Sequence, residues 1–192
     1  MKQKVIFISI SLLSLSILFY WSIGYTDKGN ISPKNLVIRG EYLVTIGGCN
    51  DCHTPKIFTK EGMEFDTKRL LSGHPSELDI PPLESQMLGP GKWLLFNEHL
   101  TVAAGPWGLT YAANLTPDEQ TGIGLWKEEN FIQAMRTGKH MGAGRPIMPP
   151  MPWMNLTRAT DEDLTAMFAY LKSLPPIKNS VPAPTPVDEI TP

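Results

Sequence analysis

The chain has 192 residues, of which 42% are hydrophobic and 19% are charged. That is long enough for one domain with an apolar core, and too apolar for a disordered chain. The formal net charge is −2. Since a nucleic-acid-binding protein needs a clustered basic surface, we expect no nucleic-acid partner.

The N-terminus has the pattern of an export signal. Lys2 and Lys4 precede an uncharged run over residues 5–25 that is rich in Ile, Leu, Phe and Ser. The run is close to the roughly 20 residues that span a bilayer as a helix. Residues 1–24 are therefore predicted to be a signal peptide or an N-terminal membrane anchor. The rest of the chain is then exported, or held on the periplasmic side of the cytoplasmic membrane.

A polar linker is predicted over residues 25–34, and a short helix follows it. Ser32 suits the N-cap of this helix and Pro33 suits its first position. Apolar residues then recur at helical spacing until Gly47-Gly48. The segment from residue 54 to about residue 124 is rich in Gly and Pro, so it predicts long loops with short elements packed around something apolar.

Two more helices are predicted nearer the C-terminus. Residues 127–137 carry Phe131, Ala134 and Met135 on one face and stop at Gly138. A loop rich in Met and Pro (residues 142–155, the Met-Pro loop) separates this helix from a second one. That helix starts at a capping box, Thr160 to Asp163, and ends before two prolines. We expect residues 177–192 to form a Pro-rich tail that is extended and disordered over residues 181–186.

The two cysteines stand in one motif, Cys49-Asn50-Asp51-Cys52-His53. C-x-x-C-H is the attachment signature of heme c. Two thiols one short turn apart can form thioethers with the two vinyl groups of the macrocycle, and the adjacent histidine is then placed under the iron as a ligand. The motif predicts one covalent heme c, with His53 as the proximal iron ligand.

Three other readings of the motif are weaker. A disulfide oxidoreductase needs a βαβ context, which the sequence lacks. A zinc site needs about four ligands, and His74, His99 and His140 are isolated in the sequence. A disulfide between two cysteines so close together would stabilise little. The sequence therefore favours heme.

A second iron ligand is expected in the Met-Pro loop. Methionine suits an electron carrier because a thioether ligand favours ferrous iron and raises the reduction potential. Met148, Met151 and Met154 are the candidates, and prolines between them give the loop a fixed path. His140 is an alternative ligand.

Taken together, these motifs resemble class I c-type cytochromes with one heme, and more closely bacterial cytochrome c proteins and the cytochrome subunits of membrane-bound dehydrogenases. The resemblance covers about residues 39–174. Its motifs are, in chain order, Arg39-Gly40-Glu41-Tyr42-Leu43-Val44, Cys49 to Pro55, Ala113-Asn114-Leu115-Thr116-Pro117-Asp118, Thr121-Gly122-Ile123-Gly124 with Trp126, the Met-Pro loop, Asp163-Leu164 and Phe168-Ala169-Tyr170-Leu171.

The resemblance implies a mainly α fold, preceded by one hydrophobic N-terminal helix, with residues 35–176 as the cytochrome domain. It implies that the helix of Gly40 crosses the helix of Tyr170 at a close contact. It also selects Met151 as the distal ligand, because Pro149-Pro150-Met151-Pro152-Trp153 fits the family's Pro-x-Met-Pro-aromatic pattern, with Met148 in reserve.

The chain departs from a minimal class I domain by an insertion over about residues 57–108. It would act as a shield over one heme edge or as a docking surface for a partner. Asn114, Trp126 and Arg145 are candidates for contacts with the heme propionates, since arginine pairs well with carboxylates.

The expected function is electron transfer with redox partner proteins, without a small-molecule substrate and not as an enzyme. The chain would work alone or as the heme subunit of a dehydrogenase or respiratory complex. The alternative is a peroxidase-like heme enzyme or a sensor with an open sixth position on the iron, although no catalytic His and Arg pair is placed for it.

Overall fold

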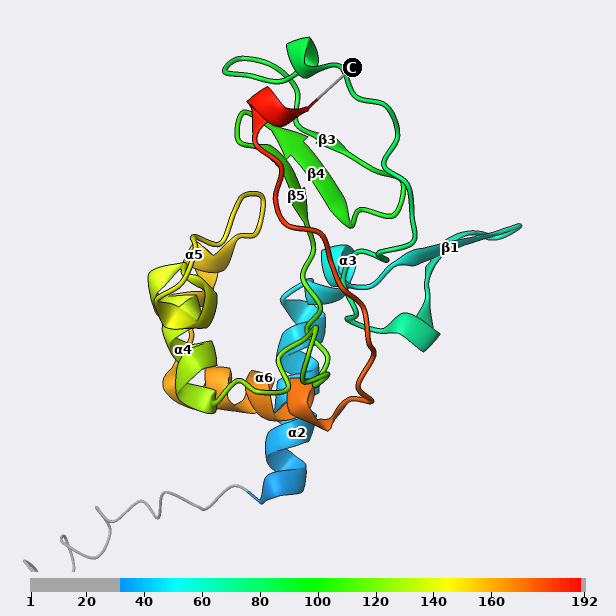
Figure 1. Cartoon of the computed structure of the whole chain (residues 1–192). Helices are drawn as coiled ribbons and strands as arrows, with labels where there is room; N and C mark the ends of the chain where they lie inside the picture. Colours follow the sequence, from blue (N-terminus) through cyan, green and yellow to red (C-terminus); the bar gives the residue numbers. More distant parts are fainter. Residues whose placement is uncertain (1–31, 191–192) are drawn as a thin grey trace, which may run out of the picture. The chain divides into compact units, whose positions relative to one another are not determined.

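The computed structural model describes residues 32–190 (Figure 1). The predicted export segment, with its hydrophobic helix, lies outside the described residues, as does most of the predicted linker. Within residues 32–190, no helix has both the length and the apolar character needed to cross a membrane.

The described part combines helices with two small sheets. The α-helices are α2 (Pro33–Ile46), α3 (Cys49–His53), α4 (Glu128–Thr137), α5 (Trp153–Leu156) and α6 (Asp161–Ser173). Short 3-10 turns are η1 (Thr67–Arg69), η2 (Ser85–Met87), η3 (His140–Gly142) and η4 (Val187–Glu189). The helices predicted before the cysteine motif, after residue 127 and after Thr160 are all present. The end of the Met-Pro loop, predicted to lack helix, forms the single turn α5.

The insertion holds the strands, and they correct the expected mainly α fold to a mixed one. One sheet is an antiparallel hairpin of β1 (Lys56–Thr59) and β2 (Gly62–Phe65). The other has the order β3 (Leu95–Phe96), β4 (Val102–Gly105) and β5 (Gly108–Tyr111), also antiparallel. The Gly- and Pro-rich segment at residues 105–108 is the turn between β4 and β5, where the chain folds back on itself and neighbouring segments pair. Helical periodicity cannot report such pairing.

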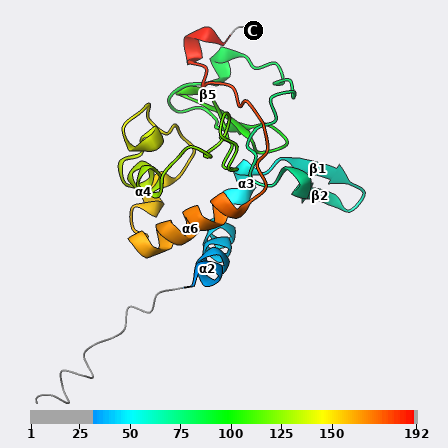
Figure 2. The same ribbon diagram turned by 60° about the horizontal axis from the view of Figure 1, so that its bottom comes forward.

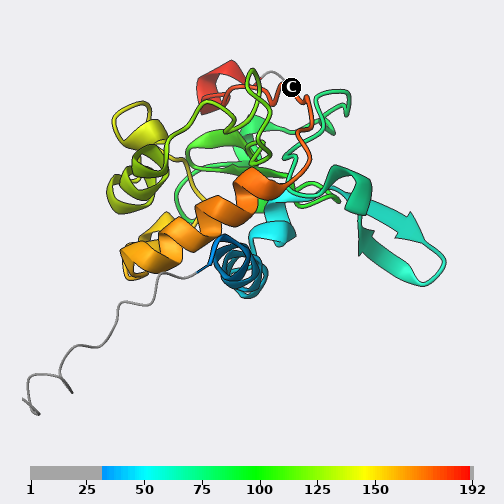
Figure 3. The same cartoon turned by 90° about the horizontal axis from the view of Figure 1, so that it is seen from below.

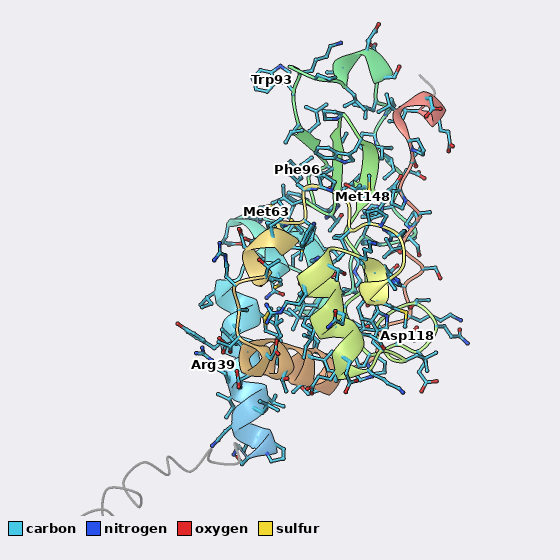
Figure 4. All side chains as sticks on the ribbon, turned by 90° about the vertical axis from the view of Figure 1, so that its left-hand side faces the viewer. Arg39, Met63, Trp93, Phe96, Asp118 and Met148 are labelled. Atoms are coloured by element: carbon cyan, nitrogen blue, oxygen red, sulfur yellow. The ribbon has the colours of Figure 1, made fainter. Side chains whose placement is uncertain are left out.

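The β1–β2 hairpin projects away from the helices (Figure 2), and all of β2 is exposed. Met63 on β2 and Phe96 on β3 are both exposed, at 50% and 46%. Figure 4 labels both side chains, together with Met148 of the Met-Pro loop. The insertion therefore presents apolar side chains to solvent instead of burying them all.

The crossing of α2 and α6 is the close contact that the resemblance implies (Figure 3). A Cβ atom added at Gly40 would lie 1.9 Å from the Ala166 carbonyl oxygen and 2.8 Å from Cβ of Tyr170. The two backbones can approach this far only because Gly40 has no side chain. Beside the contact, Arg39 Nη2 forms an ion pair with Asp163 Oδ1 at 3.0 Å.

The main core lies between α2, α4 and α6. Phe131, Ala134 and Met135 are the buried residues of α4, as their spacing predicts, and α4 ends at Gly138, whose φ is 65°. At the start of α6, the Thr160 side chain accepts a hydrogen bond from the Asp163 N–H, which confirms the predicted cap. Cys49 and Met151 are among the partly buried residues that pack against this core.

A second, smaller core lies inside the insertion. Leu88, Val102, Ala104 and Leu109 are buried together there. Ile190, near the end of the chain, packs against the same cluster. The insertion is therefore a small folded unit in which part of the C-terminal tail participates.

The expectation of a disordered tail is wrong for residues 181–186. The tail runs from α6 alongside β5 (Figure 1), where Thr185 and Leu109 exchange two backbone hydrogen bonds of 2.8 and 3.0 Å. Nearer α6, the buried Asn179 side chain donates to the carbonyls of Ser72 and His74 at 2.7 and 2.8 Å. Its Oδ1 accepts from the Ser76 N–H at 3.0 Å. The tail's backbone and side chains thus fasten it to the insertion.

We expect Asn179→Ala to destabilise the domain by about 2 kcal/mol or more, because it leaves two buried carbonyls and one N–H without their partner. Denaturant unfolding measures the loss. Asn155→Ala, at an exposed position, is the control and should change stability by less than about 0.5 kcal/mol. Equal effects of the two substitutions would show that the Asn179 hydrogen bonds do not hold the tail.

Candidate functional site

The cysteine motif forms α3, a short helix entered through Gly47-Gly48. Gly48 has a φ of 67°, a left-handed conformation that glycine adopts without strain and that separates α3 from α2. Cys49 and Cys52 stand at positions i and i+3, so their side chains lie on neighbouring parts of one helix face. Both are free thiols and only partly buried. The local structure leaves both sulfurs available for covalent attachment.

The protonation of the thiols argues against redox chemistry at sulfur. Burial raises the pKa of Cys49 to about 11, and burial also raises the pKa of Cys52. Thiols that act as nucleophiles or exchange disulfides have lowered pKa values. The zinc alternative is weakened as well, because within residues 32–190 no three His, Cys, Asp or Glu side chains gather as metal ligands.

His53 is buried and held by one hydrogen bond. Its Nδ1 lies 2.7 Å from the carbonyl oxygen of Ala113, and since a carbonyl only accepts, Nδ1 carries the proton. Burial lowers the pKa of the ring, which keeps the imidazole neutral. The other nitrogen, Nε2, then has its lone pair free. A metal-binding histidine is typically oriented in this way, with one nitrogen donating to a carbonyl and the other facing the metal.

The segment Leu71 to His74 fixes the two chain segments that meet at His53. The Gly73 N–H donates to the His53 carbonyl at 2.7 Å, and the His74 N–H donates to the Ala112 carbonyl at 2.9 Å. Gly73 has a φ of 80°, and a Cβ there would lie 2.4 Å from the Ala112 oxygen. The beginning of the insertion therefore holds both α3 and the backbone that orients the His53 ring.

The three candidate methionines of the Met-Pro loop differ in burial. Met154 lies on α5 and is 58% exposed, whereas Met148 and Met151 are partly buried. Met151 packs against the main core, as Cys49 does. The loop is tied to β5 by the Thr110 hydroxyl, which donates to the Pro149 carbonyl at 2.7 Å. Burial and packing favour Met151 over Met154 as a ligand, and its ligation stays a prediction.

The alternative ligand His140 lies at the surface. Its ring meets Trp126 edge to face, with ring centroids 4.9 Å apart and an interplanar angle of 88°. Trp126 in turn packs against the main core. The pair joins η3 to the segment before α4, so a packing role accounts for both side chains. Neither its exposure nor its ring contact favours His140 as a ligand.

The three candidate propionate contacts differ in how fully their side chains are already hydrogen-bonded. The Asn114 amide donates to the Ile177 carbonyl and the Thr121 hydroxyl, and its oxygen accepts twice from Thr116. These four bonds use its hydrogen-bonding capacity, so Asn114 acts in holding the tail. Arg145 is exposed, and within residues 32–190 its guanidinium makes one contact, of 3.5 Å with the Pro146 carbonyl. Contacts of Asn114, Arg145 and Trp126 with the heme stay predictions.

Sequence reasoning missed Ala113, Gly73 and Lys56 as parts of the site. The first acts through its backbone carbonyl, which no residue type reports. Gly73 lies in a segment without periodicity. An isolated glycine in such a segment is the one sequence signal of a close backbone approach. Lys56 lies three residues after His53. Lysine is an ordinary residue for a surface loop, and its burial here is a result of the tertiary fold.

Comparison with known proteins gives relatives that are named as subunits of dehydrogenases. No protein-family model matches the chain. It is 30% identical over 135 residues, 70% of its length, to the gluconate 2-dehydrogenase cytochrome c subunit of Pantoea cypripedii. It is 34% identical over 140 residues, 71% of its length, to the fructose dehydrogenase cytochrome subunit of Gluconobacter japonicus. A shorter match, 40% over 78 residues and 41% of the chain, is to a subunit of the nicotinate dehydrogenase of Pseudomonas putida.

These relatives are much longer than this chain. The matched part is 22% of the gluconate and fructose dehydrogenase subunits and 6% of the nicotinate dehydrogenase subunit. What the relatives share with this chain is thus one portion of a larger protein. The site geometry and these similarities lead to the same family: the chain is a cytochrome c-like protein, of the kind found in the cytochrome c subunits of dehydrogenases.

Proposed function

We propose that the chain carries single electrons on one covalently attached heme c, with His53 and Met151 as iron ligands. The observation that carries the proposal is the arrangement of α3: two free, partly buried thiols precede a buried histidine whose Nδ1 is committed to the Ala113 carbonyl. This donor set fits a heme c. It provides two sulfurs for thioether bonds and one imidazole nitrogen free for iron.

The residues of this chain bind and orient the group and keep water away. Cys49 and Cys52 would anchor the macrocycle, and His53, with its ring fixed by Ala113, would hold the iron from one side. Met151 would supply a sulfur from the Met-Pro loop. When bound, a heme supplies an iron that takes up and releases one electron. The apolar core around Cys49 and Met151 limits the access of water to the group. The exclusion of water helps to set the reduction potential and lowers the solvent reorganisation that accompanies electron transfer.

The relatives' names support a role as an electron carrier and not as a catalytic subunit, since they describe cytochrome subunits of dehydrogenases. We propose that this chain likewise exchanges electrons with redox partner proteins, one of them a dehydrogenase. The apolar run over residues 5–25 supports export or membrane anchoring of the domain. A free-standing carrier and a subunit of a complex are separated by copurification from membranes.

The test is expression of the whole chain with a heme c maturation system, followed by absorption spectra of denatured and native protein. We expect heme to stay with the denatured polypeptide and to give a thioether-type pyridine adduct. The native ferric protein should show the charge-transfer band of methionine-bound iron in the red. A Cys49→Ser, Cys52→Ser double variant is the control and should lose its heme on denaturation.

Other outcomes are equally informative. A native protein that keeps covalent heme, lacks the red band and binds carbon monoxide when reduced would have an open sixth position. That result would contradict the electron-carrier proposal and favour a heme enzyme or sensor. A wild-type chain that takes up no heme would overturn the covalent assignment itself.

A further inference from the structure

Lys56 is buried, which is unusual for a lysine. It is 3% exposed, although it lies at the start of β1 in a hairpin that is otherwise at the surface. Within residues 32–190, no carboxylate lies within ion-pairing distance of its ammonium. Burying a charge without a counter-ion is costly, so the surrounding polar groups must compensate for the lost water.

Backbone carbonyls surround the ammonium. Nζ donates to the carbonyl oxygens of Thr54 at 2.5 Å and Asp51 at 2.8 Å, with longer contacts to His99 at 3.3 Å and Asn50 at 3.4 Å. The centroid of the Phe65 ring lies 5.0 Å from Nζ. A neutral amine would turn a lone pair toward one of these oxygens. Burial lowers the pKa of Lys56. The carbonyl oxygens act in the opposite direction, because they only accept hydrogen bonds and the protonated amine has three to donate.

The cage connects the attachment helix to the insertion. The carbonyls of Asn50 and Asp51 belong to α3, and that of Thr54 follows it directly. Carbonyls at a helix C-terminus favour a cation, and the Asn50 carbonyl also accepts the Thr54 N–H at 3.2 Å. His99 comes from the far end of the insertion, and its Nδ1 donates back to the Lys56 carbonyl at 2.9 Å. One side chain thus holds together the end of α3, β1 and the segment before β4.

We propose that Lys56 is a positioning residue of the heme site: it fixes the C-terminal end of α3 and raises the reduction potential with a buried positive charge. This inference rests on the proposed function. The oxidised heme carries one more positive charge than the reduced heme, so a nearby cation disfavours the oxidised form. In a poorly solvated environment such an effect is larger than at the surface.

The test compares midpoint potentials of the purified heme-loaded protein and four variants. Lys56→Gln keeps an amide that can donate to the carbonyls but removes the charge, and Lys56→Met removes both. Lys56→Arg keeps the charge. Lys60→Gln is the matched control, because Lys60 lies in the exposed turn of the same hairpin. We expect lower potentials for the Gln and Met variants, recovery in the Arg variant and no shift in the control.

Salt separates a buried charge from a surface charge. At 1 M salt the screening length is about 3 Å, so the shift of Lys56→Gln should persist, while a surface effect would vanish. A folded, heme-loaded Lys56→Gln protein with the wild-type potential would overturn the inference. Should neither neutral variant fold, Lys56→Arg decides: a retained potential supports the inference and a lowered one overturns it. A wild-type chain without heme would instead sink the proposed function.

Discussion

A Met151→Ala variant is expected to keep its heme and to have a much lower reduction potential than the wild type. Cys49, Cys52 and His53 would still hold the group, since they lie on α3 and not on the Met-Pro loop. The thioether that favours ferrous iron would be gone. The fall should be a sizeable fraction of the roughly 0.8 V over which axial ligands set heme potentials.

Potentiometric titration measures this fall, and two readings accompany it. The red charge-transfer band should disappear, and carbon monoxide should bind to the reduced variant. Met154→Ala is the matched control, because Met154 is three residues away and 58% exposed. It should leave the potential and the band unchanged. If instead Met148→Ala loses the band and Met151→Ala keeps it, the ligand is Met148.

A Gly40→Val substitution is expected to destabilise the domain by about 3 kcal/mol or more, the upper end of the cost of overpacking. The added Cβ would lie 1.9 Å from the Ala166 oxygen, and the obstacle is the backbone of α6, which cannot turn aside as a side chain can. To admit valine, α2 and α6 must separate, and the main core between them opens. Such a loss is a large part of the roughly 5–15 kcal/mol that stabilises a typical domain.

Denaturant unfolding of the two proteins measures the effect, and the yield of heme-loaded protein gives a second reading. Glu41→Val is the matched control, since it places the same β-branched residue at the next, exposed position of α2. It should cost about 0.5 kcal/mol, the difference in helix propensity. A Gly40→Val protein as stable as this control would mean that the two helices do not cross at Gly40.

The insertion illustrates where sequence reasoning stopped. Its turns were readable from Gly and Pro, and Gly105-Pro106-Trp107-Gly108 is indeed the turn of the β4–β5 hairpin. The role of the insertion could not be predicted from the sequence, because the contacts that determine this role join residues far apart in the chain. Gly73 reaches back to His53, and Asn179 reaches the same segment from the tail. This part of the insertion orients the site, and the roles of shield and docking surface stay predictions for the rest of it.

The sequence by itself determined the attachment motif and the three longer helices, α2, α4 and α6, with their ends. These depend on neighbouring residues: a fixed C-x-x-C-H spacing, apolar residues at helical period, Thr160 as a cap and Gly138 as a stop. Gly40 was readable too, through the resemblance to class I c-type cytochromes. The hydrophobic face of each helix also followed from the sequence, because a helix must bury its apolar stripe.

Only the tertiary structure decided which polar groups are buried together. The Ala113 carbonyl that orients His53, the carbonyl cage of Lys56 and the ordered tail at Asn179 and Thr185 all depend on hydrogen bonds between residues far apart in the chain. Backbone carbonyls and amides are the same at every position, so residue identity does not reveal which of them will pair. Folding decides it, because a buried polar group must find a partner once water is excluded.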